Sequence, residues 1–472
     1  MKRHNLFKVV MLTILLMVVL SWIIPQVSID SYGTLNETGS TSPVGIFLLM
    51  NYVGEAIHYF WYVGLYVLVV GGLYGVFHKI PAYRALIDKI VGSFKNKEWI
   101  VIAVLMLFIA GVAAFANMQL AIIVLFPFVI SVVLAMGYDR ITAALATVGS
   151  VCAGLMGTAL ALNTTYGVDA FFSLSSRSNL KIKLLVFVIA VGLMIGYTIF
   201  YAKKHRTHKD EKNSLFVPEE LKKKNVRIWP LVVAFDLLLV VLILGFISWQ
   251  DPLKINFFSD LYEKANSFSI LSVPIFKNLF GLSSAFGTWS TLVEASVIVI
   301  LASWLISFIY KIKFSDYLSC FMDGCEKALK AAVLVVLIYT VLVIVVFAPY
   351  TLAILKPIIG LTDTLNVFTM SLTAFLGSVF GIDSYYAALG TGALPYVNTV
   401  YTNLASSDIT LIALIWQTMY GLAMLVAPTS VVLMATLSYL NIPYQKWLKG
   451  VWKIFLIILI VLLAMFLIMA AL

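Results

Sequence analysis

The stretch APTSVVLMATLSYLNIPYQKWLKG, from Ala427 to Gly450, decides the fold. Most of its residues are apolar enough for the interior of a bilayer, yet Pro428 is followed by the hydroxyl side chains of Thr429 and Ser430. Proline breaks a helix because it lacks an N–H and clashes with the preceding turn. Irregular backbone at membrane depth is tolerated only where it is buried in protein or lines a cavity. The stretch therefore predicts a broken membrane helix whose freed backbone groups and hydroxyls can act as ligands.

The composition of the whole chain is that of a membrane protein. Of its 472 residues, 62% are hydrophobic and 11% are charged, whereas a soluble domain has about 45–50% apolar and about 25% charged residues. Many apolar runs reach the roughly 20 residues that a helix needs to span the hydrocarbon layer. Alternating strands of about ten residues, the mark of a membrane barrel, are absent. We predict an all-α polytopic membrane protein with about 10–12 transmembrane segments.

The charges suggest how the chain is divided. The segment 203–227 carries nine Lys/Arg against four Asp/Glu, which predicts a cytoplasmic basic linker between a first half, 1–202, and a second half, 228–472. The N-terminus is expected on the same side, with 6–26 kept as the first membrane helix rather than cleaved as a secretory signal. The net charge of +10 is not a nucleic-acid signal, because basic residues gather in loops between apolar runs.

The two halves share a loose plan. Each has membrane helices and an amphipathic arm, 78–99 in the first half and 311–330 in the second. Each also has a helix interrupted by polar residues, at 162–167 and at 427–430. Paired interrupted helices in corresponding positions are the best sequence pointer to a transporter site. One difficulty is that charge favours the cytoplasmic side for both arms, whereas an inverted repeat would place them on opposite sides.

Several short elements match a known family signature: Gly137-Tyr138-Asp139, the small-residue run 149–157, Asn163 at the first break, Gly287-Thr288-Trp289 with Glu294, and Pro428-Thr429-Ser430 with Pro443-Tyr444 and Trp447. With them the chain resembles the YfcC-like and DcuC-like carriers, the anaerobic four-carbon-dicarboxylate carrier family of the ion transporter superfamily. The chain departs from that family at 377–386, where members typically carry a Ser-Gly-Ser-Gly-Gln hairpin tip. This departure puts the substrate in doubt more than the fold.

The resemblance implies an elevator-type secondary transporter that is usually dimeric. Each half would contain scaffold helices, an arm, a re-entrant hairpin and a broken helix, and the two hairpins and two breaks would enclose one site. The first hairpin would cover 100–136 with its tip near 113–119, and the second would lie near 365–395. Substrates known in the family include dicarboxylates and amino acids, among them arginine and ornithine in exchange.

Asp383 is the strongest candidate site residue. It lies in an apolar neighbourhood, flanked by Ser378 and Ser384. An ionisable residue inside a membrane protein is costly and is by default a functional hypothesis. Its carboxylate could take a proton, ligate Na⁺ or pair with a substrate ammonium. The alternative is a loop aspartate at the membrane interface with access to water.

Other candidate ligands lie at the first hairpin tip and at the two breaks: Asn117, Asn163, Thr164, Thr165, Thr429 and Ser430. Carbonyl-rich breaks suit Na⁺ and freed amides suit carboxylates, so a sodium site near Asn163 and Thr429 is a further expectation. The alternative is ordinary hydrogen bonding between membrane helices. No other metal site and no cofactor is expected, because the three cysteines do not form a metal-binding set.

The function predicted is secondary active transport of a small carboxylate-bearing solute, an amino acid or a dicarboxylate, across the plasma membrane. No enzyme or ATP-binding motif is present, so transport would be driven by H⁺, by Na⁺ or by exchange. No Lys or Arg stands convincingly at mid-membrane, so a carboxylate would be held by amides, hydroxyls or a bound cation. The expected partners are the substrate, the lipid bilayer and a second copy in a homodimer. The alternatives are an arginine/ornithine-type antiporter, a channel and a membrane scaffold.

Overall fold

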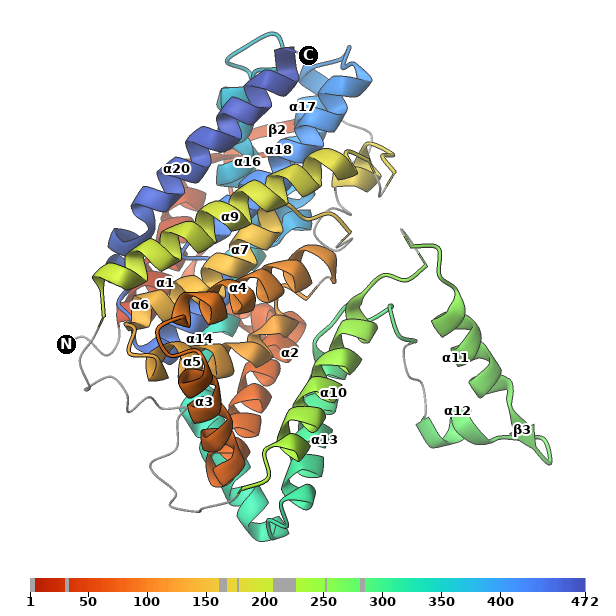
Figure 1. The fold of residues 1–472 in the computed structure, drawn as a ribbon. Coiled ribbons are helices and arrows are strands. Elements are labelled where there is room, and N and C mark those ends of the chain that lie inside the picture. The colour runs from red at the N-terminus through yellow and green to blue at the C-terminus, as the bar shows by residue number, and fades with distance from the viewer. Residues whose placement is uncertain are drawn as a thin grey trace.

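Helices make up most of the computed structural model, which describes residues 5–29, 34–116, 118–160, 168–175, 178–206, 226–250, 253–280 and 285–471 (Figure 1). The α-helices are α1 (Asn5–Ile23), α2 (Ile46–Lys79), α3 (Pro81–Ser93), α4 (Glu98–Phe115), α5 (Phe126–Ala135), α6 (Arg140–Ala144), α7 (Ser150–Met156), α9 (Leu180–Lys204), α10 (Trp229–Phe246), α11 (Phe257–Ser267), α12 (Ile275–Phe280), α13 (Val293–Ile309), α14 (Phe314–Phe347), α15 (Thr351–Ile359), α16 (Val367–Gly381), α17 (Ala393–Val400), α18 (Ser406–Met424), α19 (Val431–Leu440) and α20 (Tyr444–Ala471).

The remaining elements are short. A 3₁₀ turn, η1 (Ala121–Leu125), and two π-turns, η2 (Leu145–Gly149) and η3 (Tyr386–Gly390), join helices within the body. Two antiparallel hairpins pair β1 (Pro25–Ile29) with β2 (Leu35–Thr41) and β3 (Ser269–Ile270) with β4 (Val273–Pro274). In the first of them Val27 lies opposite Glu37 and Ile29 opposite Leu35.

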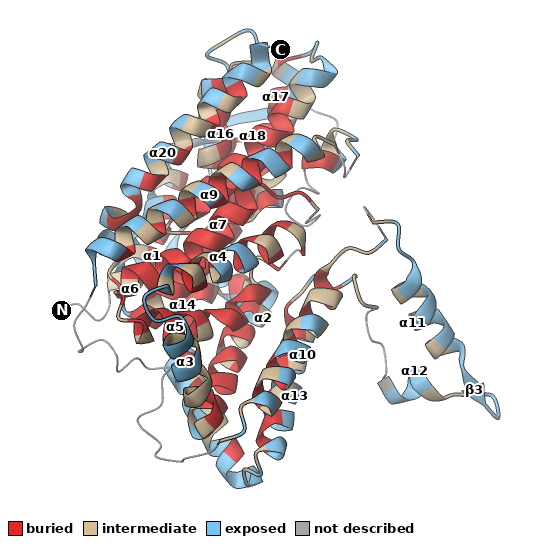
Figure 2. Cartoon of the chain, viewed as in Figure 1, coloured by how far each residue is buried: buried red, intermediate tan, exposed pale blue. Residues whose placement is uncertain are grey.

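The predicted helical membrane class is confirmed. In the described residues, seven helices are long and apolar enough to cross a membrane: α1, α2, α4, α9, α10, α14 and α20. Other apolar runs form shorter helices of 10–17 residues, such as α13, α16 and α19. The most deeply buried helices lie in the middle of the body, including α7 and α18, whereas α11 and α12 stand away from it with exposed side chains (Figure 2).

Two long helices, α2 and α14, form an antiparallel pair. Phe60 stacks on Tyr339 with ring centroids 4.0 Å apart. Further along, glycines let the two backbones approach closely: a Cβ added at Gly75 would lie 2.1 Å from the carbonyl oxygen of Cys320, and one at Gly324 would lie 2.2 Å from that of Gly71. The pair is therefore fixed by backbone-to-backbone contact, the mode of packing that small residues allow in membranes.

This close approach can be tested with two matched substitutions. We expect Gly324→Ala to lower the free energy of unfolding by about 1–3 kcal/mol, because the new methyl group must push α14 away from α2. We expect Gly192→Ala in α9 to be neutral or stabilising by at most about 1 kcal/mol, since its Cβ would meet nothing within 4 Å. Unfolding of both variants in detergent micelles measures the difference, and equal stabilities would contradict the packing described.

Both amphipathic arms lie at the same end of the molecule, because the end of α2 lies beside the start of α14. The first arm forms a separate helix, α3, after Pro81. The second, expected at 311–330, is not a separate element, since from Phe314 onward it is continuous with the membrane part of α14. Nothing in 314–347 breaks the helix, and α14 carries the chain to the opposite end before the second hairpin begins.

The segment from α4 to α5 starts and finishes at one end of the molecule. Arg206, just after α9, lies 3.3 Å from the carboxylate of Glu98 at the start of α4 and also contacts the ring of Tyr138, just beyond α5. The chain between them turns at 118–120. The path is that of a hairpin that opens toward the end where the arms lie.

The segment from α16 to α17 has the opposite orientation. Its two ends meet where the Tyr401 hydroxyl donates a hydrogen bond to the carbonyl oxygen of Ile359, at 2.8 Å, and lies 3.5 Å from the hydroxyl of Thr362. α15, which holds Ile359, follows the far end of α14 and packs on β1. The turn at 382–385 therefore points into the body from the side opposite to the first hairpin.

Candidate functional site

The turns of the two hairpins meet at two adjoining cavities of about 270 and 50 Å³. The hairpin residues Gln119, Leu120 and Asp383 line both, together with Tyr339 of α14. The larger cavity extends toward α2 and α10, and the smaller toward α7, α18 and the start of α19. Residues far apart in the sequence thus line these two cavities together.

Asp383 is held in place by the backbone of its own turn. Helix α16 ends because Ile382 adopts φ +64°, a strained conformation for a β-branched residue. The Oδ1 atom of Asp383 then accepts hydrogen bonds from the amides of Tyr385, at 2.8 Å, and Tyr386, at 3.1 Å. Within the described part of the chain, Oδ2 has no hydrogen-bond donor. The half-buried carboxylate is therefore fixed through one oxygen, and the other oxygen stays free to accept a hydrogen bond.

Another wall of the smaller cavity is the break after α18. Ser430 caps α19, its Oγ accepting from the amide of Leu433 at 3.4 Å, and Thr429 donates to the carbonyl oxygen of Val379 in α16 at 2.8 Å. Ser430, Val431 and Val432 all line the cavity. The first amides of a helix have no intrahelical acceptor, and the helix dipole adds partial positive charge there. The start of α19 is thus suited to hold an anionic group.

The structure brings only some of the predicted site residues to these cavities. Asp383 and Ser430 line them. Ser378 and Thr429 are buried and donate to backbone carbonyl oxygens of α16, and the buried Ser384 is also absent from the walls. The candidates Asn117, Asn163, Thr164 and Thr165, with the first break at 162–167, lie outside the described residues.

Comparison with known proteins identifies the family. Residues 4–471 match the model of the C4-dicarboxylate anaerobic carrier family. The chain belongs to this family. An uncharacterised protein of Haemophilus influenzae is 23% identical over 403 residues, which cover 82% of this chain and 71% of that protein. Among solved structures, the YdaH transporter of Alcanivorax borkumensis aligns over 98% of this chain and 97% of its own, with 12% identity and a TM-score of 0.41.

Membership of the anaerobic carrier family confirms the resemblance found in the sequence and makes the protein a multi-pass membrane protein of a carrier family. The candidate site also contains residues that the sequence did not single out. The hydroxyl of Tyr420 lies 3.5 Å from both the carbonyl oxygen of Ile382 and Oε1 of Gln119. Gln119 falls within the expected hairpin tip, but Tyr339 and Tyr420 stand inside apolar runs, where nothing local marks them.

The described residues that line the two cavities carry little charge. Asp383 is the only ionisable side chain besides tyrosine and cysteine among the described residues lining the two cavities, and no Lys, Arg or His is among them. A negatively charged substrate would therefore meet a carboxylate rather than a basic clamp. Any negative charge on the substrate must be compensated by backbone amides or by a cation that enters with it.

A buried ion pair outside the cavities also went unpredicted. The Nζ atom of Lys183, in the first turn of α9, lies 3.5 Å from Oδ2 of Asp169, and the two residues are only 2% and 6% exposed. Close by, the Asn179 side chain donates to the carbonyl oxygen of Thr410 at the start of α18, at 3.1 Å. The sequence analysis expected no buried basic residue in the membrane part of the chain. Tertiary packing nevertheless buries Lys183 at the start of its helix.

Proposed function

We propose that the protein is a secondary active transporter that moves a small carboxylate-bearing solute, a C4-dicarboxylate or an amino acid, across the plasma membrane. The observation that carries this proposal is the pair of oppositely directed hairpin turns that meet the broken helix at one cavity, with Asp383 as the one carboxylate among its described lining residues. A binding site near the middle of the fold, formed by interrupted helices, is what a carrier needs.

The cavity offers two poles for such a solute. The amides at the start of α19, beside Ser430, suit a substrate carboxylate. Asp383, on another wall, suits a positive charge. An amino acid satisfies both poles with its own carboxylate and ammonium groups. A dicarboxylate has no positive charge for Asp383, so a proton or Na⁺ must bind there with it. For this substrate class, Asp383 would therefore couple transport to the cation.

The elevator motion is part of the proposal. Glycines allow several helices to pack so closely that they would move as one body. A Cβ added at Gly154 would lie 2.3 Å from the carbonyl oxygen of Ala110, and one added at Gly421 would lie 2.5 Å from the amide nitrogen of Met156. These contacts join α4, α7 and α18. The pair α2 and α14 would be the scaffold past which this body slides.

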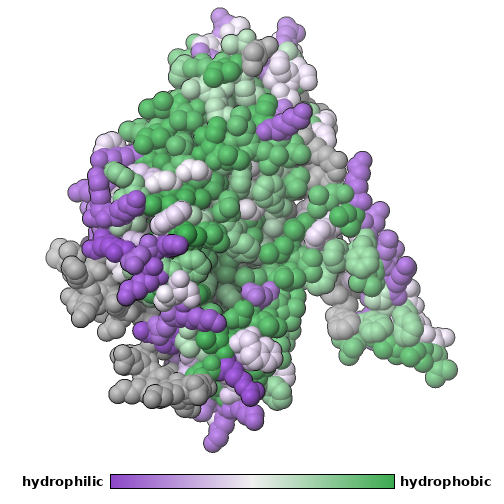
Figure 3. All heavy atoms as spheres, viewed as in Figure 1, coloured by the Kyte–Doolittle hydropathy of each residue, from purple (hydrophilic) through white to green (hydrophobic). Residues whose placement is uncertain are grey.

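The orientation follows from charge. The end where the arms lie also carries the basic ends of α9 and α20, and hydrophilic side chains gather there, at the left and bottom of Figure 3, whereas the middle of the visible face is apolar. By the positive-inside rule this end, with the N-terminus and 203–227, would face the cytoplasm. A homodimer is a further part of the proposal, since Asp236 is exposed within the apolar helix α10, where a charge needs a partner.

Counterflow in proteoliposomes tests the function. Vesicles loaded with unlabelled succinate, neutral amino acids or arginine are mixed with a trace of the labelled compound, with and without Na⁺ and with and without a pH gradient. We expect saturable accumulation of one class, driven by a cation if that class is the dicarboxylates. Vesicles without protein are the control. No exchange of any class, by protein shown to be folded and inserted, would contradict the proposal and favour a scaffold, and non-saturable leakage would favour a channel.

The second candidate function is exchange of basic amino acids such as arginine and ornithine. It is favoured by the lone carboxylate and by the absence of basic side chains among the described residues lining the cavities. Exchange of labelled arginine for internal ornithine, without Na⁺ or a pH gradient, would select this function over dicarboxylate transport.

A further inference from the structure

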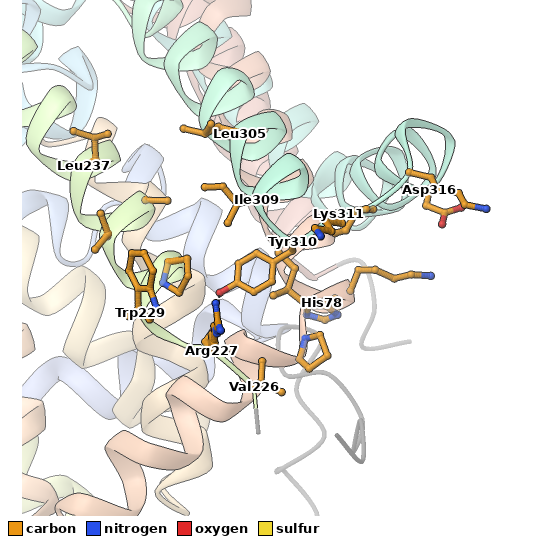
Figure 4. A pocket seen from close by; sticks show the side chains of 18 residues that line it. His78, Val226, Arg227, Trp229, Leu237, Leu305, Ile309, Tyr310, Lys311 and Asp316 are labelled. Atoms are coloured by element: carbon orange, nitrogen blue, oxygen red, sulfur yellow. The ribbon is translucent and has the colours of Figure 1, made fainter. Parts of the chain in front are cut away.

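A third and larger cavity, of about 1300 Å³, lies where the end of α2, the start of α10, the end of α13 and the start of α14 come together (Figure 4). It shares no residue with the two cavities around Asp383. It belongs to the same end of the molecule as the two arms. The transport proposal gives it no role.

One part of this cavity is strongly basic. Four basic side chains line it: Lys79, Arg227, Lys311 and Lys313. Among the described residues, the lining has one carboxylate, that of Asp316. None of these five residues forms an ion pair with another described residue. Four cationic side chains from three separate parts of the chain thus line one cavity, with one carboxylate among the described residues. Such a cluster of positive charge attracts anions.

The other part is apolar and opens toward the membrane. Leu237 of α10 faces Leu305 and Ile309 of α13 across the cavity, and Val233 also lines it. Leu237 is 53% exposed and Leu305 43% exposed, so the cavity wall continues onto the outer faces of these two membrane helices.

Aromatic side chains mark the boundary between the two parts. Trp229 lines the cavity, and the hydroxyl of Tyr310 donates a hydrogen bond to the carbonyl oxygen of Arg227 at 2.9 Å. Trp and Tyr are enriched where the polar and apolar layers of a membrane meet. The boundary therefore places the basic part at headgroup depth and the apolar part at acyl-chain depth.

We propose that this cavity binds an anionic phospholipid, with its phosphate among Lys79, Arg227, Lys311 and Lys313 and its acyl chains between α10 and α13. Basic pockets between membrane helices are suited to such headgroups, and each basic side chain near the surface adds about 1 kcal/mol of attraction. A free phosphate would use the basic part but not the apolar walls, so the shape and chemistry favour the lipid.

Native mass spectrometry of the full chain in mild detergent tests this inference, using phosphatidylglycerol and phosphatidylcholine of equal chain length. We expect phosphatidylglycerol to bind at least about tenfold more tightly. A variant carrying Lys79→Gln, Arg227→Gln, Lys311→Gln and Lys313→Gln should lose this preference. The matched control carries Lys95→Gln, Lys97→Gln, Lys446→Gln and Lys449→Gln, which removes the same charge at the same end without touching the cavity, and should keep it.

Three results would overturn the inference: equal binding of the two lipids by the unmodified chain, equal loss in the cavity and control variants, or glycerol 3-phosphate binding as tightly as phosphatidylglycerol. The last result would make the cavity a site for soluble phosphates. If the fourfold variant does not fold, the double variant Arg227→Gln/Lys311→Gln replaces it, with Lys95→Gln/Lys446→Gln as its control. Circular dichroism and gel filtration establish folding in each case.

Discussion

Replacing Asp383 by Asn is expected to abolish coupled transport while the protein stays folded and inserted. The Oδ1 atom of Asn can still accept the hydrogen bonds from Tyr385 and Tyr386, so the turn keeps its shape. The substitution removes the only carboxylate that the described residues place in the cavities. Losing one partner of a desolvated charge pair costs about 3–5 kcal/mol, which corresponds to roughly a hundredfold to several thousandfold weaker binding of the cation or ammonium group.

Concentrative uptake and counterflow measure this loss. The matched control is Asp363→Asn, an exposed aspartate shortly before the same hairpin that lines neither cavity. The control should transport at the normal rate. Normal concentrative uptake by the Asp383→Asn protein would contradict the role assigned to Asp383. Loss of accumulation with exchange retained would instead place Asp383 in ion coupling rather than in substrate binding.

Replacing Lys183 by Met is expected to lower the free energy of unfolding by about 3–5 kcal/mol. The substitution removes the ammonium group that lies 3.5 Å from the buried carboxylate of Asp169, and removing one partner of a buried ion pair costs far more than the intact pair contributes to stability. Unfolding in detergent micelles gives the magnitude. Lys181→Met is the control, because Lys181 is in the same turn of α9 but exposed.

The double variant Lys183→Met/Asp169→Asn separates charge pairing from packing. Because it removes both charges, we expect it to recover most of the stability lost in Lys183→Met. A double variant as unstable as the single one would show that the packing of the Lys183 side chain, rather than its charge, stabilises this part of the fold.

The sequence was sufficient for the helical membrane class, because hydrophobic length is a local property that the bilayer demands of every spanning helix. It was less informative where a helix continues past a change in composition. The charged residues from Asp316 to Lys330 suggested a separate arm, yet α14 runs through them to Phe347, since charge alone does not end a helix. The break at 427–430 could be predicted because Pro428 prevents a regular helix wherever the chain is placed.

The cavity and its neighbours were harder to predict because they depend on tertiary contacts. Nothing close to Tyr339 or Tyr420 in the sequence indicates that their side chains lie near Asp383. The pairing of Lys183 with Asp169 was missed for the same reason: each looks like a residue at a helix end until packing removes both from water. Ser378 and Thr429, chosen for their hydroxyls, instead bond to backbone carbonyl oxygens of α16.

The glycine contacts between α2 and α14 have a consequence for the surrounding membrane. Each helix has 34 residues and is therefore roughly 50 Å long, against a hydrocarbon layer of about 30 Å. Because the two backbones touch, neither helix can bend alone to match a thinner or thicker bilayer, and the pair must tilt as a single rigid rod. Because Tyr339 of α14 lines both cavities, we expect a tilt of the pair to displace this wall of the candidate site, so that transport should depend on lipid chain length.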